Sequence, residues 1–95
     1  MRAIERTTAL FLACLGEAVP DLRVSVERSS TRYGRSNYVH IRDAEQRRYW
    51  KVRISDHAVD MRRAQSGRED FYIQSKDKPG RWAVWLGDFR REVLG

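Results

Sequence analysis

The sequence predicts a small α+β protein, a two-layer sandwich whose antiparallel sheet of about four strands carries both helices on one face. Segments with apolar residues at helical spacing lie near the two ends of the chain. Between them lie short segments in which apolar and polar residues alternate, as they do in half-buried strands. The predicted order is α-β-β-β-β-α, and 95 residues suit one domain, residues 1–95.

The two helices are predicted from apolar stripes at spacings of three and four residues. The first covers residues 3–18 and ends before Pro20. Its stripe consists of Ile4, Thr8, Phe11, Leu15 and Ala18. The second begins at Arg81, and its stripe consists of Trp82, Trp85, Leu86, Phe89 and Val93.

Four strands are predicted from period-two alternation, at residues 22–27, 37–42, 48–55 and 71–74. The second and third are close enough in sequence to form an antiparallel hairpin. The polar stretch SSTRYGRS, residues 29–36, contains Gly34 and is predicted to be a loop. Turns are expected at residues 43–46 and 76–80.

Basic charge is the strongest compositional signal. The chain carries 19 Lys and Arg against 13 Asp and Glu, a net charge of +6. Such a surface attracts nucleic acid, an anionic membrane or an acidic protein. Basic composition without a specific partner is the competing explanation.

Alternation places a set of polar side chains on the sheet face opposite the helices. This set is Tyr38, His40, Arg42, Tyr49, Lys51, Arg53, Ser55, Tyr72 and Gln74. Rings that stack on bases and cations that neutralise phosphate are what a single-stranded nucleic acid needs. Cations of the predicted loop, Arg28, Arg32 and Arg35, would extend the binding surface. An acidic protein could use the same anchors, and cross-strand pairs of this kind also stabilise sheets that bind nothing.

The third strand ends in Ser55, Asp56 and His57, which raises the question of catalysis. Neighbouring residues of an extended strand point to opposite faces, so these three cannot form a catalytic triad. We expect Asp56 to cap a short helix or stabilise a turn, and His57 to be a titratable donor at the edge of the binding face.

A metal-dependent hydrolase is a less favoured alternative. Its metal ligands would be His40, His57, Asp56 and Asp60, or the pair Glu69–Asp70, but two histidines make no spaced metal motif. No catalytic residue, metal or cofactor is therefore expected.

A cytoplasmic protein is expected. Cys14 is the only cysteine, which excludes an intrachain disulfide, and Leu10–Leu15 is too short an apolar run for a signal peptide.

The strand pair carries a resemblance. Its residues Ser36, Tyr38, Val39 and Ile41 (S-x-Y-V-x-I), followed by YWKVRISDH at residues 49–57, resemble a pattern in small, uncharacterised bacterial and phage proteins. The resemblance implies a mobile-element setting, in which small binding proteins target nucleic acid or host nucleoprotein complexes. Anti-CRISPR inhibitors that bind a CRISPR effector protein are one such class and form the alternative function. The sequence leaves the oligomeric state open.

Overall fold

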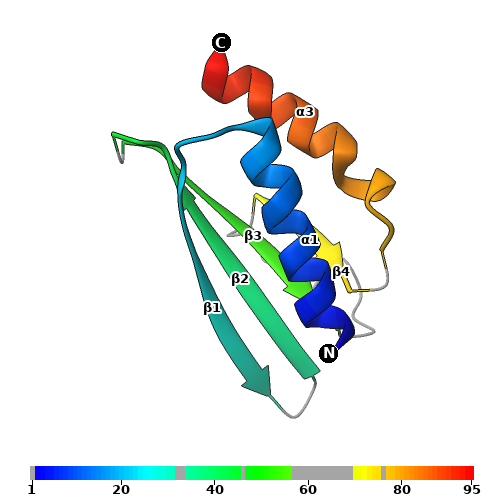
Figure 1. The fold of residues 1–95 in the computed structure, drawn as a ribbon. Coiled ribbons are helices and arrows are strands. Elements are labelled where there is room, and N and C mark those ends of the chain that lie inside the picture. Colours follow the sequence, from blue (N-terminus) through cyan, green and yellow to red (C-terminus); the bar gives the residue numbers. More distant parts are fainter. Residues whose placement is uncertain (1, 32–33, 46, 57–69, 76) are drawn as a thin grey trace.

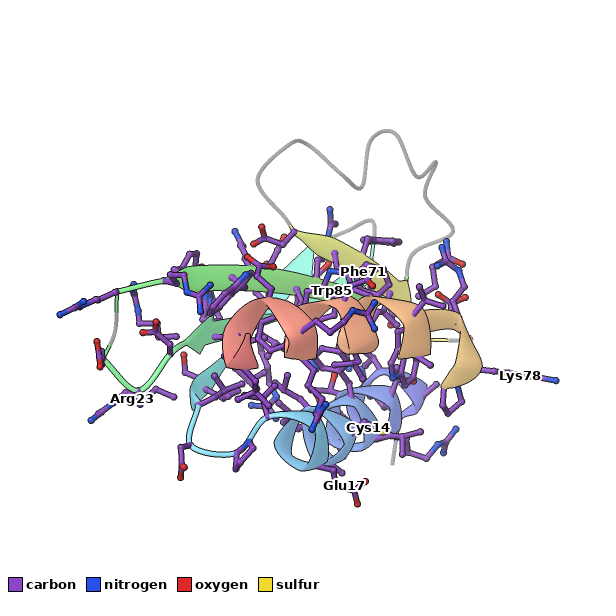
Figure 2. The ribbon with its side chains drawn as sticks, turned by 90° about the horizontal axis from the view of Figure 1, so that it is seen from above. Cys14, Glu17, Arg23, Phe71, Lys78 and Trp85 are labelled. Atoms are coloured by element: carbon purple, nitrogen blue, oxygen red, sulfur yellow. The ribbon has the colours of Figure 1, made fainter. Side chains whose placement is uncertain are left out.

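The computed structural model describes residues 2–31, 34–45, 47–56, 70–75 and 77–95. It confirms the α+β fold and the order α-β-β-β-β-α. The elements are α1 (Ala3–Ala18), β1 (Arg23–Thr31), β2 (Gly34–Arg42), β3 (Tyr49–Ser55), β4 (Phe71–Gln74) and α3 (Gly80–Leu94). The strands form one sheet, and both helices lie on the same side of it (Figures 1 and 2).

The sheet is mixed rather than wholly antiparallel. Its order is β1-β2-β3-β4; β1, β2 and β3 are antiparallel neighbours, whereas β4 pairs with β3 in parallel. The expectation of an antiparallel sheet was therefore wrong for β4, because alternation predicts which residues share a face but not the direction of a strand. Asp70 secures the start of β4, since its backbone and its carboxylate bond to the C=O and N–H of Lys51.

The first hairpin is tighter than predicted. Residues 29–31 continue β1 and residues 34–36 begin β2, so most of SSTRYGRS pairs across strands instead of forming a loop. Gly34, the first residue of β2, has a φ of 134°, a conformation that favours glycine. Nine consecutive residue pairs join β1 to β2 without a bulge.

The core lies between the sheet and the two helices. Val39, Ile41, Val52, Ile54 and Ile73 form its sheet side and are completely buried. Aromatic contacts join the layers: Phe11 of α1 meets Trp82 of α3 edge-on, with ring centroids 6.2 Å apart. Trp50 of β3 meets Phe89 in the same way at 4.9 Å.

A second, partly exposed aromatic stack closes the β4 side of the core. The ring of Trp85 stacks on Phe71 of β4 and on Phe89, each at 5.1 Å between centroids (Figure 2). Both predicted apolar stripes thus face the sheet, and this leaves the opposite face of the sheet free of helices within the described residues.

Candidate nucleic-acid interface

Six predicted site residues share the face of β2 and β3 that points away from α1 and α3. They form three cross-strand pairs: Tyr38 with Arg53, His40 with Lys51, and Arg42 with Tyr49. Directly paired residues of antiparallel strands lie on the same side of a sheet, so the alternation in sequence predicted this grouping correctly. We call Tyr38, His40, Arg42, Tyr49, Lys51 and Arg53 the outer face.

Two cations of β3 hold positions around the ring of Tyr38. Lys51 Nζ lies 4.6 Å from the ring centroid, and the Arg53 guanidinium carbon lies 5.8 Å from it. Arg53 is anchored further, because its Nε donates to the hydroxyl of Ser36 at 3.1 Å. A ring flanked by two cations can offer a π-face and neutralise a nearby anion at the same place.

A chain of polar contacts crosses the other half of the outer face. Glu27 Oε1 lies 2.9 Å from His40 Nε2, and His40 Nδ1 contacts the hydroxyl of Tyr49. The two ring nitrogens of His40 thus join a carboxylate of β1 to a phenol of β3. Arg42 completes the group, with its guanidinium carbon 4.8 Å from the centroid of the Tyr49 ring.

Burial and neighbouring charges shift the ionisation of the Tyr49 hydroxyl. Desolvation raises the pKa of this hydroxyl above its ordinary value; Arg42 opposes the rise, and Asp70 and Glu27 add to it. The phenol therefore stays protonated at neutral pH and can donate a hydrogen bond. Tyr49 is 41% exposed and accessible to a ligand.

Tyr72 does not belong to the accessible site. It pairs with Arg53 across β3 and β4 and therefore points to the outer side, but it is completely buried. The Arg53 guanidinium carbon lies 5.7 Å from the centroid of its ring, and its hydroxyl has no hydrogen-bond partner among the described residues. The prediction that Tyr72 anchors a ligand was wrong, because alternation assigns a side of the sheet but says nothing about what covers it.

Replacing Tyr72 with phenylalanine should stabilise the protein. A buried hydroxyl without a partner costs about 1–3 kcal/mol of desolvation, and the Tyr72→Phe variant removes that group while keeping the ring. We expect the free energy of unfolding from urea titration to rise by about 1 kcal/mol with an unchanged m-value. A loss of stability would show that the hydroxyl finds a partner in solution.

Two arginines of the predicted basic loop lie on the helix side of the sheet. Arg28 donates hydrogen bonds from Nε and Nη2 to the two carboxylate oxygens of Glu5 in α1, at 3.2 and 3.1 Å. Across β1 and β2, Arg28 pairs with the buried Asn37 and Ser30 pairs with Arg35. Arg35 therefore lies on the same side of the sheet as Asn37, toward the helices. The expectation that Arg28 and Arg35 extend the outer face was wrong, because both lie in paired strands and the pleat directs these positions toward α1.

The Glu5 carboxylate is a structural group in this arrangement. Hydrogen bonds from Arg28 and then from Asn37 lower its pKa below the ordinary value, against a smaller opposing effect of burial. A carboxylate with a lowered pKa in the folded state stabilises the fold above its unfolded-state pKa, and this contribution disappears as the pH falls through the lowered value. Asn37 also donates to the hydroxyl of Thr8 at 3.0 Å, which links β2 to α1.

Ser55 and Asp56 are engaged by the backbone of β2. The Asp56 carboxylate accepts the N–H of Arg35 at 2.7 Å, and the Asp56 N–H donates to the carbonyl of Arg35 at 3.1 Å. The Ser55 hydroxyl also donates to that carbonyl, at 3.2 Å. Ser55 and Asp56 therefore fasten the end of β3 to β2. The short helix or turn that Asp56 was expected to cap would follow it, outside the described residues.

Several candidates lie outside the described residues: Arg32, His57, Asp60 and Glu69. Within the described ranges, no group of three or more His, Cys, Asp or Glu side chains could hold a metal ion. No helix in the described part of the chain has the length and apolar character needed to cross a membrane.

Strand β1 contributes residues to the site that the sequence pattern did not predict. Glu27 and Arg23 are paired with Tyr38 and Arg42 and so share their side of the sheet. The period-two pattern of β1 was visible, but only the register shows which residue of β1 stands beside each residue of β2. Glu27 is the one carboxylate among the described residues that bonds to an outer-face side chain.

Comparisons with known proteins leave the interface to be interpreted from its own geometry. No protein-family model, curated protein or solved structure matches this chain.

Proposed function

We propose that the chain binds single-stranded nucleic acid through the outer face. The supporting observation is the pairing of both accessible tyrosines of the described residues with cations: Lys51 and Arg53 at Tyr38, and Arg42 at Tyr49. A single strand presents unstacked bases beside phosphates, and this is the combination that alternating rings and cations recognise.

The cations over the rings do not prevent base stacking. A cation–π contact at an exposed site contributes about 0.5–1 kcal/mol, whereas stacking of a base contributes about 1–3 kcal/mol. A base can therefore displace the cation from the ring. The displaced Lys51, Arg53 or Arg42 remains beside the ring, within reach of the adjoining phosphate.

The net charge supports the same ligand class. The outer face carries Arg42, Lys51 and Arg53, and the opposing Glu27 carboxylate is occupied by His40. The whole chain has a net charge of +6, which favours encounter with a polyanion. The sequence contains no run of glycine and aromatic residues like the RNP motifs of RRM domains. This argues against base recognition of the RRM type and favours binding that tolerates many nucleotide sequences.

Fluorescence anisotropy tests the proposal. Labelled single-stranded DNA, single-stranded RNA and duplex of equal length are titrated with protein between about 20 and 200 mM salt. We expect a preference for single strands. The slope of log K against log[salt] should be about −2, because each phosphate contact of Arg42, Lys51 and Arg53 releases about 0.7 counterions. No binding at the lowest salt would reject the proposal and leave an acidic protein, such as the effector bound by an anti-CRISPR-type inhibitor, as the target.

A further inference from the structure

The β1 strand presents a long, regular and open edge. In the described sheet it is the terminal strand, it contains nine residues without proline, and it pairs with β2 without a bulge (Figure 1). Natural sheets usually shorten, bulge or cover such an edge, because its unpaired backbone groups recruit another strand. None of these devices is present in the described part of β1.

The hydrogen-bond pattern shows which backbone groups face the open edge. Asp43 N–H bonds to the Arg48 carbonyl and Asp56 N–H to the Arg35 carbonyl, so the odd-numbered residues of β2 bond toward β3. The even-numbered residues of β2 then bond toward β1, where the register pairs them with odd-numbered residues. Even-numbered residues of β1, including Val24 and Val26, therefore direct N–H and C=O toward the open edge.

An apolar groove runs beside this edge on the helix side. It has a volume of about 400 Å³ and is lined mainly by Leu12, Leu15, Val19, Leu22, Val24 and Val26. Val24 is 41% exposed although it pairs with the completely buried Ile41. The core is thus unfinished at β1, where apolar side chains from an added strand would cover it.

We propose that a second copy of this chain occupies the edge, with the two β1 strands antiparallel about a two-fold axis at Ser25. This register places Val24 of each copy opposite Val26 of the other, in the positions whose backbone groups are open. It also places Arg23 opposite Glu27 twice, on the outer side of the sheet. Arg23 and Glu27 form non-hydrogen-bonded pairs, the kind in which facing side chains approach most closely.

The neighbouring registers lack this complementarity. An axis at Val26 places Arg23 opposite Ser29 and Glu27 opposite Ser25, so that neither charge faces an opposite charge. An axis at Val24 places Glu27 opposite Asp21, so that two carboxylates face each other. Charge complementarity therefore selects both the second copy as the partner and Ser25 as the centre.

The dimer would place two outer faces on one side of a continuous eight-stranded sheet. Their centres would be separated by four inter-strand spacings, about 19 Å. This inference does not rest on the proposed function, because association through β1 requires no nucleic acid.

Sedimentation velocity of the full chain without nucleic acid, from about 10 μM to 1 mM, tests the dimer. We expect the average mass to rise with concentration from 11.2 kDa toward twice that value. Arg23→Glu, which places carboxylates opposite each other, and Val24→Lys should each weaken association about tenfold or more. Arg23→Glu should not destabilise the fold of the monomer. Arg23 pairs with Arg42 across β1 and β2, so the variant exchanges a pair of like charges for a pair of opposite charges.

The charge-exchanged double variant, Arg23→Glu with Glu27→Arg, should restore association, and circular dichroism melts confirm that each variant folds. Arg81→Glu on α3 makes the same charge change far from the edge and should leave the mass unchanged. A mass of one chain at every concentration would overturn the proposal. So would a dimer insensitive to Arg23→Glu and Val24→Lys, or a folded double variant that stays monomeric.

Discussion

Simultaneous replacement of Arg42, Lys51 and Arg53 with alanine should lower the affinity for a single strand about 100-fold at about 0.1 M salt. Three phosphate contacts at about 0.7 released counterions each contribute about two powers of ten at this concentration. For the same reason, the magnitude of the slope of log K against log[salt] should decrease by about 2. Anisotropy titrations of the wild type and the variant at several salt concentrations measure both quantities.

A matched control separates this site from the general charge of the protein. Lys78, Arg81 and Arg90 are exposed, lie at or on α3, and comprise one lysine and two arginines, as the outer-face set does. Lys78 projects away from the body of the molecule (Figure 2). Their alanine variant has the same net charge of +3 and should retain most of the affinity and slope. Equal losses in both triple variants would show diffuse electrostatic attraction and contradict an outer-face site.

The largest stability effect is expected from Trp82. This side chain is 1% exposed and meets Phe11 edge-on across the interface of the two helices. Removing a buried tryptophan costs about 3–5 kcal/mol, so the Trp82→Ala variant should lose a large part of the stability of a small domain. Urea unfolding followed by circular dichroism measures the loss, and Trp82→Leu supplies an intermediate that keeps much of the apolar volume.

Trp85 provides the comparison for this prediction. Its ring stacks on Phe71 and Phe89 but remains partly exposed, so Trp85→Ala should cost about 1–3 kcal/mol. An equal or larger loss at Trp85 would contradict the helix orientation described above. The apolar stripe of α3 alone treats the two tryptophans alike, because spacing identifies the buried side of a helix but not the depth of each residue.

Sequence reasoning succeeded where periodicity controls the structure. It predicted residues 3–18 and 71–74 with the observed bounds, and it grouped Tyr38, His40 and Arg42 on one side of β2. Side-chain alternation follows directly from strand geometry, so it survives any error in the topology.

It failed where a neighbour from elsewhere in the chain decides the outcome. Arg28 was expected to bind a ligand, but Glu5 of α1 holds it on the helix side. Tyr72 was expected at the surface and is buried, and β4 runs parallel to β3. Each of these features depends on tertiary contacts that leave no local signature in composition or spacing.

The contact between Phe11 and Trp82 has a consequence for how the chain folds. The core is completed only when α1 and α3, from opposite ends of the described chain, meet over the sheet, where the rings of Phe11 and Trp82 are in contact. Bringing α1 and α3 together closes a long loop, and the entropy lost in closing it opposes the contact until the helices have docked. The hairpins β1–β2 and β2–β3 join consecutive strands and close much shorter loops. We therefore expect the rate of folding to be set by the docking of the two helices, with the three-stranded meander formed first and its apolar side open until they arrive.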